Sequence, residues 1–391
     1  QTRSLSPTAS EDDIEELVAG NTAFALELYD AVNDAEGNLF LSPYSISVAL
    51  GMTYAGALGD TESQMADTLH FNLTQDRLHP AFNKLDLELA SRGEDAEGKD
   101  EEPFRLHIVN QLWGQEDYEF LPDFLDTLAV NYGAGLRLMD FESVPDSSRI
   151  EINEWVADQT GQRIKDLVPQ GGIDTLTRLV LTNAIYFNAA WDSPFEVANT
   201  AEGTFAQLDG TEITVPMMSQ EQVYPYVERD NVKAVELPYD GNELSMILLV
   251  PEPGTFADFE DTLTSDELNL LIGSLAATNL RLSLPKFEYN AKLSLAQTLA
   301  AMGMPAAFAT EANFSGMDGT RDLQISDVFH KAFIAVDESG TEAAAATAGV
   351  VGTTSIPDEP LVFSIDRPFL FLIRDRKTGA ILFLGRVTAP E

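Results

Sequence analysis

One stretch, residues 178–188, constrains the fold of this chain more than any other. It reads RLVLTNAIYFN and is apolar on both of the faces that alternate along a strand. A strand of this kind belongs to a sheet that is covered on both sides. Residues 244–250 have the same pattern. In residues 178–188, one face carries Leu179, Leu181, Ile185 and Phe187, and the other carries Val180, Ala184 and Tyr186.

The other patterns predict helices in the first half of the chain and antiparallel strands in the second. Residues 10–32 begin with a capping Ser, carry acids in the first turn and repeat apolar residues at helical spacing. Residues 42–57 open with Ser-Pro and predict a second helix, and residues 152–168 predict a third. Two strands at 369–374 and 380–387 are joined by a glycine turn. We therefore expect one α+β domain.

The charge of the chain excludes several classes of partner. There are 64 acidic and 23 basic residues, which give a formal net charge of −41. Nucleic acid, anionic membranes and heparin-like polyanions need clustered Lys and Arg, so none of them is an expected partner. Such charge opposes compaction unless ions screen it, and at ~1 M salt the screening length falls to roughly 3 Å. We expect a halophilic prokaryote as the source, with an acidic protein of an ordinary cell as the alternative.

The sequence lacks the motifs that would indicate an enzyme or a membrane protein. No G-x-S-x-G, H-E-x-x-H, G-x-x-x-x-G-K-[ST] or G-x-G-x-x-G pattern occurs. His70, His79 and His107 lie in contexts typical of structural histidines. The chain has no Cys, so disulfides and thiolate metal sites are excluded, and we predict no metal or cofactor. No apolar run reaches the ~18 residues of a membrane span, so membrane insertion is not expected.

Residues 337–348 do not fit the rest of the pattern, because a block of small residues follows the strand-like run 330–336. Ser339 and Glu342 match a capping box, and Ala favours helix, so local rules predict a short helix. Such a helix would have no large apolar side chain to hold it, and residues 349–357 are also small or β-branched. We therefore predict an exposed, mobile loop.

The same residues are also suited to enter a sheet. With the period of a strand, Thr341, Ala343, Ala345 and Thr347 share one face, and Glu342, Ala344 and Ala346 share the other. A strand of this composition can enter between two existing strands without placing a bulky or charged side chain in the core.

Several motifs together resemble the serpin family, and the resemblance covers residues 13–387. They are SPYSIS at 42–47, TNAIYF at 182–187 followed by Trp191 and Phe195, LPKF at 284–287, HKA at 330–332, RPFLF at 367–371 and GRV at 385–387. The resemblance implies a tail at 1–12 and a single serpin-like domain at 13–391, with about nine helices and three β-sheets. It also implies a reactive loop at about 338–360.

The function that the resemblance implies is suicide inhibition of a serine protease. The protease acylates itself on the loop, the cut loop enters the large central sheet as an extra strand, and the protease is deformed before water releases it. Small residues at 343–346 favour an inhibitor over a non-inhibitory carrier or chaperone. The hinge is expected at Glu338, Gly340, Thr341, Ala343, Ala344, Ala345 and Ala346.

The resemblance also implies roles for residues outside the loop. Ser42, Ser45, Asn183 and His330 are expected to form a buried polar cluster, the shutter, which holds the sheet closed yet able to reopen. Trp191 is expected to pack at the breach, the top of the sheet where insertion begins. His330 is then a buried, hydrogen-bonded histidine and not a catalyst.

The family's usual spacing places the cut between Thr354 and Ser355. The stretch from there to Pro368 looks about three residues longer than usual, so Val351 and Thr353 are alternatives. No Arg, Lys, Phe, Tyr or Leu occurs between residues 340 and 355, which favours an elastase-like or subtilisin-like protease. A cysteine protease target remains open. We expect a monomer at the cell surface or outside the cell, with the cytoplasm as the alternative.

Overall fold

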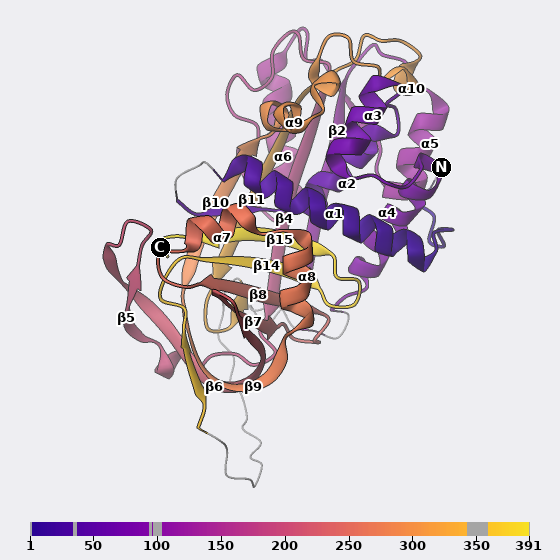
Figure 1. Ribbon diagram of the computed structural model, residues 1–391. Coiled ribbons are helices and arrows are strands. Elements are labelled where there is room, and N and C mark those ends of the chain that lie inside the picture. The colour runs from indigo at the N-terminus through magenta and orange to yellow at the C-terminus, as the bar shows by residue number, and fades with distance from the viewer. Residues whose placement is uncertain (1, 34–36, 94–95, 97–103, 342–358, 391) are drawn as a thin grey trace.

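The computed structural model describes residues 2–33, 37–93, 96, 104–341 and 359–390. Its strands form two hydrogen-bonded networks. Figure 1 shows most of the helices around the long strands β2 and β4, with the second network below them. The described helices are α1 (Glu11–Val32), α2 (Pro43–Tyr54), α3 (Asp60–Leu69), α4 (Gln75–Ala90), α5 (Pro122–Tyr132), α6 (Pro145–Gln159), α7 (Phe256–Thr262), α8 (Ser265–Gly273), α9 (Ala296–Met302) and α10 (Ser315–Asp318), with 3-10 turns at Val197–Asn199 and Pro305–Phe308.

The six-stranded sheet contains the strand that was expected to be buried on both faces. Its order is β10-β11-β12-β4-β2-β3. Strand β4 is antiparallel to β2 and parallel to β11, and β11 is antiparallel to β10. The bounds are β2 (Arg105–Gln115), β3 (Leu136–Met139), β4 (Leu179–Ala190), β10 (Phe287–Ser294), β11 (Ile325–Val336) and β12 (Gly340–Thr341).

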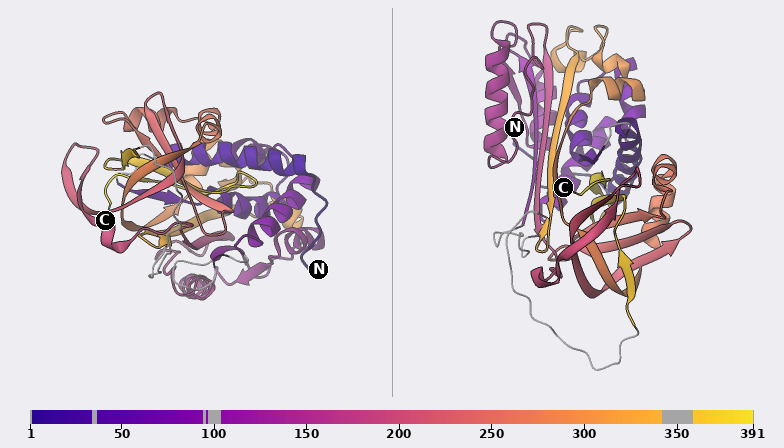
Figure 2. Two further views of the ribbon diagram at one scale, coloured as in Figure 1. Left: turned by 90° about the horizontal axis from the view of Figure 1, so that it is seen from below. Right: turned by 90° about the vertical axis from the view of Figure 1, so that its left-hand side faces the viewer.

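Two layers cover this sheet, which confirms the prediction from residues 178–188. Leu181 and Ile185 belong to the main core, which also contains buried residues of α1 and α2. Val180 and Ala184 face the other way and join a second apolar cluster with Ile152 of α6. The right-hand view of Figure 2 shows α6 on one side of the sheet and the first helices of the chain on the other.

The second network contains nine strands and accounts for two of the three expected sheets. Its order is β1-β15-β14-β8-β7-β6-β9-β13, with β5 paired to β6. The long strand β6 joins its two parts, because residues 212–226 pair with β5 and β9 and residues 226–229 pair with β7. The bounds are β1 (Leu39–Leu41), β5 (Ala201–Ala206), β6 (Glu212–Arg229), β7 (Val232–Pro238), β8 (Leu244–Pro251), β9 (Ala276–Pro285), β13 (Leu361–Ser364), β14 (Phe369–Asp375) and β15 (Ile381–Val387).

Two of the three predicted helices begin where their capping residues indicate. Ser10 caps α1 in a capping box with Asp13, and Ser42 caps α2 with Pro43 in its first turn. The prediction of a helix over residues 152–168 was wrong in its bounds. That helix, α6, starts at Pro145 and ends at Gln159, because the next turn places Gly161 and the following residue at positive φ.

The segment before α1 lies against the helical part of the domain. The Arg3 Nε donates a hydrogen bond to Asn83 Oδ1 at 2.8 Å, and the same guanidinium pairs with Asp86 at 2.6 Å. The backbone N–H of Ser4 donates to the carbonyl of Val130 at 2.9 Å. These contacts join the segment to α4 and α5. Among the described helices, none has the length and apolar character needed to cross a membrane.

Candidate functional site

The candidate site is a split at one end of the six-stranded sheet. Strands β4 and β11 pair in parallel from Leu179 and Ile325 to Ile185 and Ala332. Beyond this point the short strand β12 lies between them and pairs antiparallel with both. Two residues of the predicted hinge, Gly340 and Thr341, therefore already occupy the mouth of the split.

A tight turn brings β12 back between the two strands. The backbone N–H of Asp337 donates to the carbonyl of Gly340 at 3.0 Å, and the N–H of Ser339 donates to Asp337 Oδ1 at 2.9 Å. Gly340 has φ of +154°, and a Cβ there would lie 2.2 Å from the carbonyl oxygen of Ala189. Only glycine allows β12 to approach β4 this closely.

Thr341 is the first side chain of β12 that enters the core. It is 2% exposed, and its Oγ1 lies 2.8 Å from the hydroxyl of Tyr239. Burial raises the pKa of Tyr239, so this phenol stays neutral. Thr341 points inward, so Ala343 and Ala345 would point inward too if the same strand continued past residue 341.

Trp191 lies at this mouth, where the breach was expected. Its ring stacks on Tyr239 with the centroids 4.7 Å apart and an interplanar angle of 8°. The indole Nε1 donates to the carbonyl of Asp337 at 3.0 Å, and the backbone N–H donates to the carbonyl of Ser339 at 2.9 Å. Trp191 thus fixes the turn by hydrogen bonds as well as by packing.

Glu338, the first residue of the predicted hinge, is 6% exposed and fully partnered. One carboxylate oxygen pairs with Lys286 Nζ at 2.8 Å, and the other accepts from Thr200 Oγ1 at 2.7 Å. Burial raises the pKa of Glu338, but the hydrogen bonds from Lys286 and Thr200 outweigh it and hold the pKa below its usual value. The carboxylate is therefore charged at neutral pH and anchors the start of the loop.

The four residues predicted for the shutter meet where β4 and β11 are still paired. His330 and Asn183 are register partners on the two strands, and the ring Nδ1 of His330 is hydrogen-bonded to Asn183 Oδ1. The backbone N–H of Ser42 donates to His330 Nε2 at 3.2 Å, and Asn183 Nδ2 donates to Ser45 Oγ. All four residues have 0% exposure.

These contacts fix the protonation of His330. Ser42 donates to Nε2 and Asn183 accepts from Nδ1, which requires the neutral tautomer with hydrogen on Nδ1. Burial lowers the pKa of His330 to about 3. The imidazole is therefore neutral, with both ring nitrogens hydrogen-bonded inside the fold.

The shutter and the breach are two separate groups along one line of separation. Asn183 and Ala189 are six positions apart on β4, which corresponds to about 20 Å of strand. Both groups hold β4 or β11 to other parts of the fold. Separating β4 from β11 beyond the split would break the hydrogen bond between His330 and Asn183.

Sequence reasoning missed several partners in these groups, among them Asn110, Lys286, Thr200 and Tyr239. Asn110 on β2 accepts a hydrogen bond from Asn183 and donates to the carbonyl of Ser45. The sequence did not single out Asn110, because Gln111 and Gln115 are further amides in the same strand. Lys286 lay inside a motif that carried the resemblance, but its pairing with Glu338 was not predicted. Nothing local indicated Tyr239.

The other predicted hinge and cut residues lie outside the described residues, namely Ala343, Ala344, Ala345, Ala346, Val351, Thr353, Thr354 and Ser355. Among the residues that are described, no group of three or more His, Asp or Glu side chains is placed to hold a metal ion.

His79, one of the other histidines, is buried and its ring is hydrogen-bonded to the Tyr132 hydroxyl at 2.7 Å. Burial lowers its pKa to about 4.

Comparison with known proteins places the chain in a large group of relatives. The family model for "Serpin (serine protease inhibitor)" matches residues 19–390. A serpin-like protein of Thermococcus kodakarensis is 40% identical over 98% of this chain and 89% of its own length. The leukocyte elastase inhibitor of Homo sapiens is 38% identical over 96% of this chain and 100% of its own. The solved structure of the thermophilic serpin Tengpin in the native state has a TM-score of 0.87 and 30% identity, covering 100% of this chain and 97% of Tengpin.

Proposed function

Because the chain belongs to the serpin family, we propose that it is a suicide inhibitor of a serine protease that cuts its loop after a small residue. Serpins as a family inhibit proteases and are not catalytic enzymes. The proposal adds a mechanism, insertion of the cut loop between β4 and β11, and a class of target.

The position of β12 is the observation that carries the proposal. Gly340 and Thr341 pair with β4 on one side and β11 on the other, so a continuing strand would follow the same antiparallel register. The seven register pairs between β4 and β11 would then be exchanged for pairs with the new strand. Each inserted residue finds strand partners on both sides, which offsets the loss of direct β4–β11 pairing.

The intact loop is tied at both ends. Its second end continues into β13, which pairs in parallel with β9 from Leu361 and Leu280 onward. A cut near Thr354 would release the segment that follows Thr341 from β13, while Thr341 itself stays between β4 and β11. The 14 residues from Thr341 to Thr354 would span roughly 43 Å as a strand, and β4 from Ala189 to Leu179 spans about 33 Å. The freed segment is therefore long enough to run the length of the sheet.

The chemical step belongs to the protease. Its serine oxygen attacks the carbonyl carbon of the residue before the cut, and the C–N bond breaks with transfer of a proton to the leaving amine. The product is an ester between the two proteins and a new amino terminus on the fragment that carries β13. Insertion then carries the ester-linked protease toward the far end of the sheet before water cleaves the ester.

We propose an elastase-like or subtilisin-like target, on two grounds. The loop lacks Arg, Lys, Phe, Tyr and Leu between residues 340 and 355, so proteases that need a large side chain directly before the cut find none there. Relatives that are 37–39% identical carry the name leukocyte elastase inhibitor. We place the cut at Thr354–Ser355, with Val351 and Thr353 as the alternatives.

A gel with protease tests the proposal. Mixing the protein with elastase-like and subtilisin-like proteases is expected to give an SDS-resistant band at the summed mass, and sequencing the released peptide locates the cut. Ala345→Arg places a charge on the inward face that Thr341 defines, so it is expected to convert the inhibitor to a substrate. The matched variant Ala344→Arg, on the outward face, is expected to trap almost as wild type. Proteases that only clip the loop and stay active would leave a non-inhibitory carrier as the better hypothesis.

A further inference from the structure

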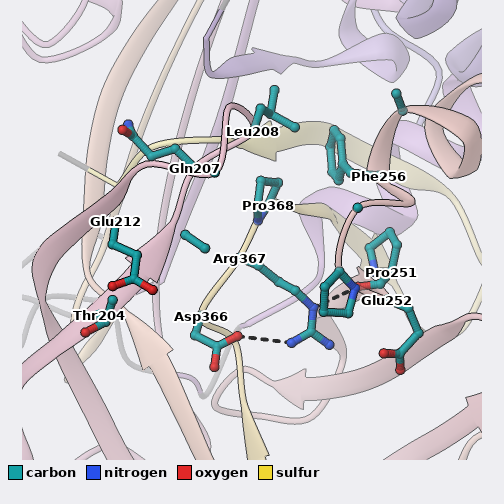
Figure 3. A pocket seen from close by; sticks show the side chains of 15 residues that line it. Thr204, Gln207, Leu208, Glu212, Pro251, Glu252, Phe256, Asp366, Arg367 and Pro368 are labelled. Atoms are coloured by element: carbon teal, nitrogen blue, oxygen red, sulfur yellow. Dashed lines mark hydrogen bonds and ion pairs between the residues drawn. The ribbon is translucent and has the colours of Figure 1, made fainter.

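A cavity of about 610 Å³ lies in the nine-stranded network, apart from the split in the other sheet. Three segments that are distant in sequence form it, residues 204–212 of the β5–β6 hairpin, residues 251–257 between β8 and α7, and residues 366–368 before β14. Figure 3 shows the side chains that line it. Its volume falls in the range of small-molecule sites, roughly 300–1,000 Å³.

One part of the lining is apolar. Phe256 is 6% exposed, and Pro251 and Pro368 are also buried. Leu208, near the end of the hairpin, is 55% exposed and lies above these residues in the view of Figure 3. A ligand in the cavity would remove the Leu208 side chain from water, which favours an apolar portion in that ligand.

The charged side chains of the cavity carry an excess of negative charge. Arg367 donates from Nε to the carbonyl of Pro251 at 2.8 Å and pairs through Nη1 with Asp366 at 3.0 Å. Glu252 pairs with Lys233 at 3.4 Å. Glu212 has no ion-pair partner among the residues that the structure describes, and Figure 3 shows its carboxylate on the same side of the view as that of Asp366.

We propose that this cavity binds a small amphipathic organic cation, such as a primary amine with a hydrocarbon body. The ammonium group would lie near Glu212, which has no ion-pair partner among the described residues, and the hydrocarbon body would cover Leu208 and Phe256. An anion fits less well, because the one guanidinium of the cavity is already held by Asp366 and the carbonyl of Pro251. The inference concerns a site outside the loop and does not depend on protease inhibition.

The bound cation would contact three segments of the fold that are distant in sequence. The N–H of Ala206 donates to the carbonyl of Asp366 at 2.8 Å, between the end of β5 and the segment that follows β13. A ligand that contacts the hairpin, the β8–α7 connection and residues 366–368 adds contacts across the same gap. Binding to the folded form alone raises the melting temperature by mass action.

Calorimetric titration of the full chain with 2-phenylethylammonium tests the site, at the lowest salt concentration that preserves the fold. We expect saturable binding with one site per chain. Glu212→Gln keeps the size of the side chain and removes its charge, so it is expected to weaken binding about three- to fivefold, the effect of one solvent-accessible ion pair. The neutral analogue 2-phenylethanol is expected to bind more weakly by a similar factor.

The control is Glu202→Gln, an exposed carboxylate on β5 of the same hairpin that does not line the cavity, and it is expected to bind as wild type. Leu208→Ser is expected to weaken the amine and the alcohol alike. Three outcomes would each overturn the proposal. The amine could show no saturable binding, wild type and Glu212→Gln could bind it equally within twofold, or 3-phenylpropanoate could bind more tightly than the amine. Titration of Ala345→Arg, expected to match wild type, separates this result from the fate of the inhibitor hypothesis.

Discussion

Replacing Thr341 by Glu places a carboxylate at the mouth of the split. The native side chain is 2% exposed and bonds to Tyr239 at 2.8 Å. Burying an unpaired carboxylate costs roughly several kcal/mol, even after the surrounding protein has relaxed. Lys286, a cation at this end of the sheet, is already paired with Glu338.

The interactions that hold β12 in place are weaker than this penalty. Three register pairs and the bond between Thr341 and Tyr239 join β12 to its neighbours. At a net ~0.5–1.5 kcal/mol per hydrogen bond, they contribute about 2–6 kcal/mol together, and about 1.5–4.5 kcal/mol once Thr341→Glu has removed the bond to Tyr239. We therefore expect β12 of the Thr341→Glu variant to leave the split, because this avoids burying the charge. We also expect the cut loop of this variant to enter the sheet too slowly to trap a protease.

Tryptophan fluorescence and the protease gel measure the two effects. Trp191 is one of three Trp residues, and it contacts both Tyr239 and the turn before β12, so its emission is expected to shift when β12 leaves. The shift is expected to vanish in a Trp191→Phe background. Emission and trapping that match wild type would refute the reasoning from burial.

Thr341→Val is the matched control. It keeps the shape of the side chain and removes only the hydroxyl, which leaves the Tyr239 hydroxyl without this partner. The expected loss in unfolding free energy is about 1–3 kcal/mol. Because Val is apolar, β12 is expected to stay between the strands and trapping to remain close to wild type.

Three further predictions concern the shutter, the hinge anchor and the charge. Asn183→Ala removes bonds to His330, Ser45 and Asn110, and is expected to lower the unfolding free energy by about 2–4 kcal/mol in urea titrations. Because the pKa of Glu338 is lowered in the folded protein, its carboxylate contributes to the free energy of unfolding above its unfolded pKa. This contribution is lost as pH falls through its folded pKa. The free energy of unfolding should therefore fall less steeply from pH 7 to pH 3 in Glu338→Gln than in wild type. The charge of −41 predicts a higher melting temperature in molar salt than in dilute buffer, and equal melting curves would contradict a halophilic source.

The sequence was most informative where a local pattern determines a local structure. The two apolar faces of residues 178–188 predicted correctly that β4 is covered on both sides, since alternation alone assigns Val180 and Leu181 to opposite layers. Ser10 and Ser42 predicted the starts of α1 and α2, because a cap depends on the next three residues. The end of α6 was missed because left-handed residues after Gln159 are not encoded by apolar spacing.

The candidate site was less accessible to sequence reasoning because its contacts span the whole chain. Ser42 and His330 were brought together by the resemblance and not by any pattern between them. Asn110 and Tyr239 were missed because each acts through a side chain more than 70 residues away in sequence. The entry of β12 into the split was also not predicted, although Gly340 was expected in the hinge and is the residue that permits it.

Insertion of the cut loop between β4 and β11 is tested most directly by denaturant unfolding before and after a single cut near Thr354. Loop insertion adds a strand with partners on both sides, so the cut protein is predicted to unfold at a clearly higher denaturant concentration than the intact one. The Ala345→Arg variant, cut at the same bond, is predicted to gain little. A cut wild-type protein that is no more stable than the intact form would contradict insertion and, with it, the proposed mechanism of inhibition.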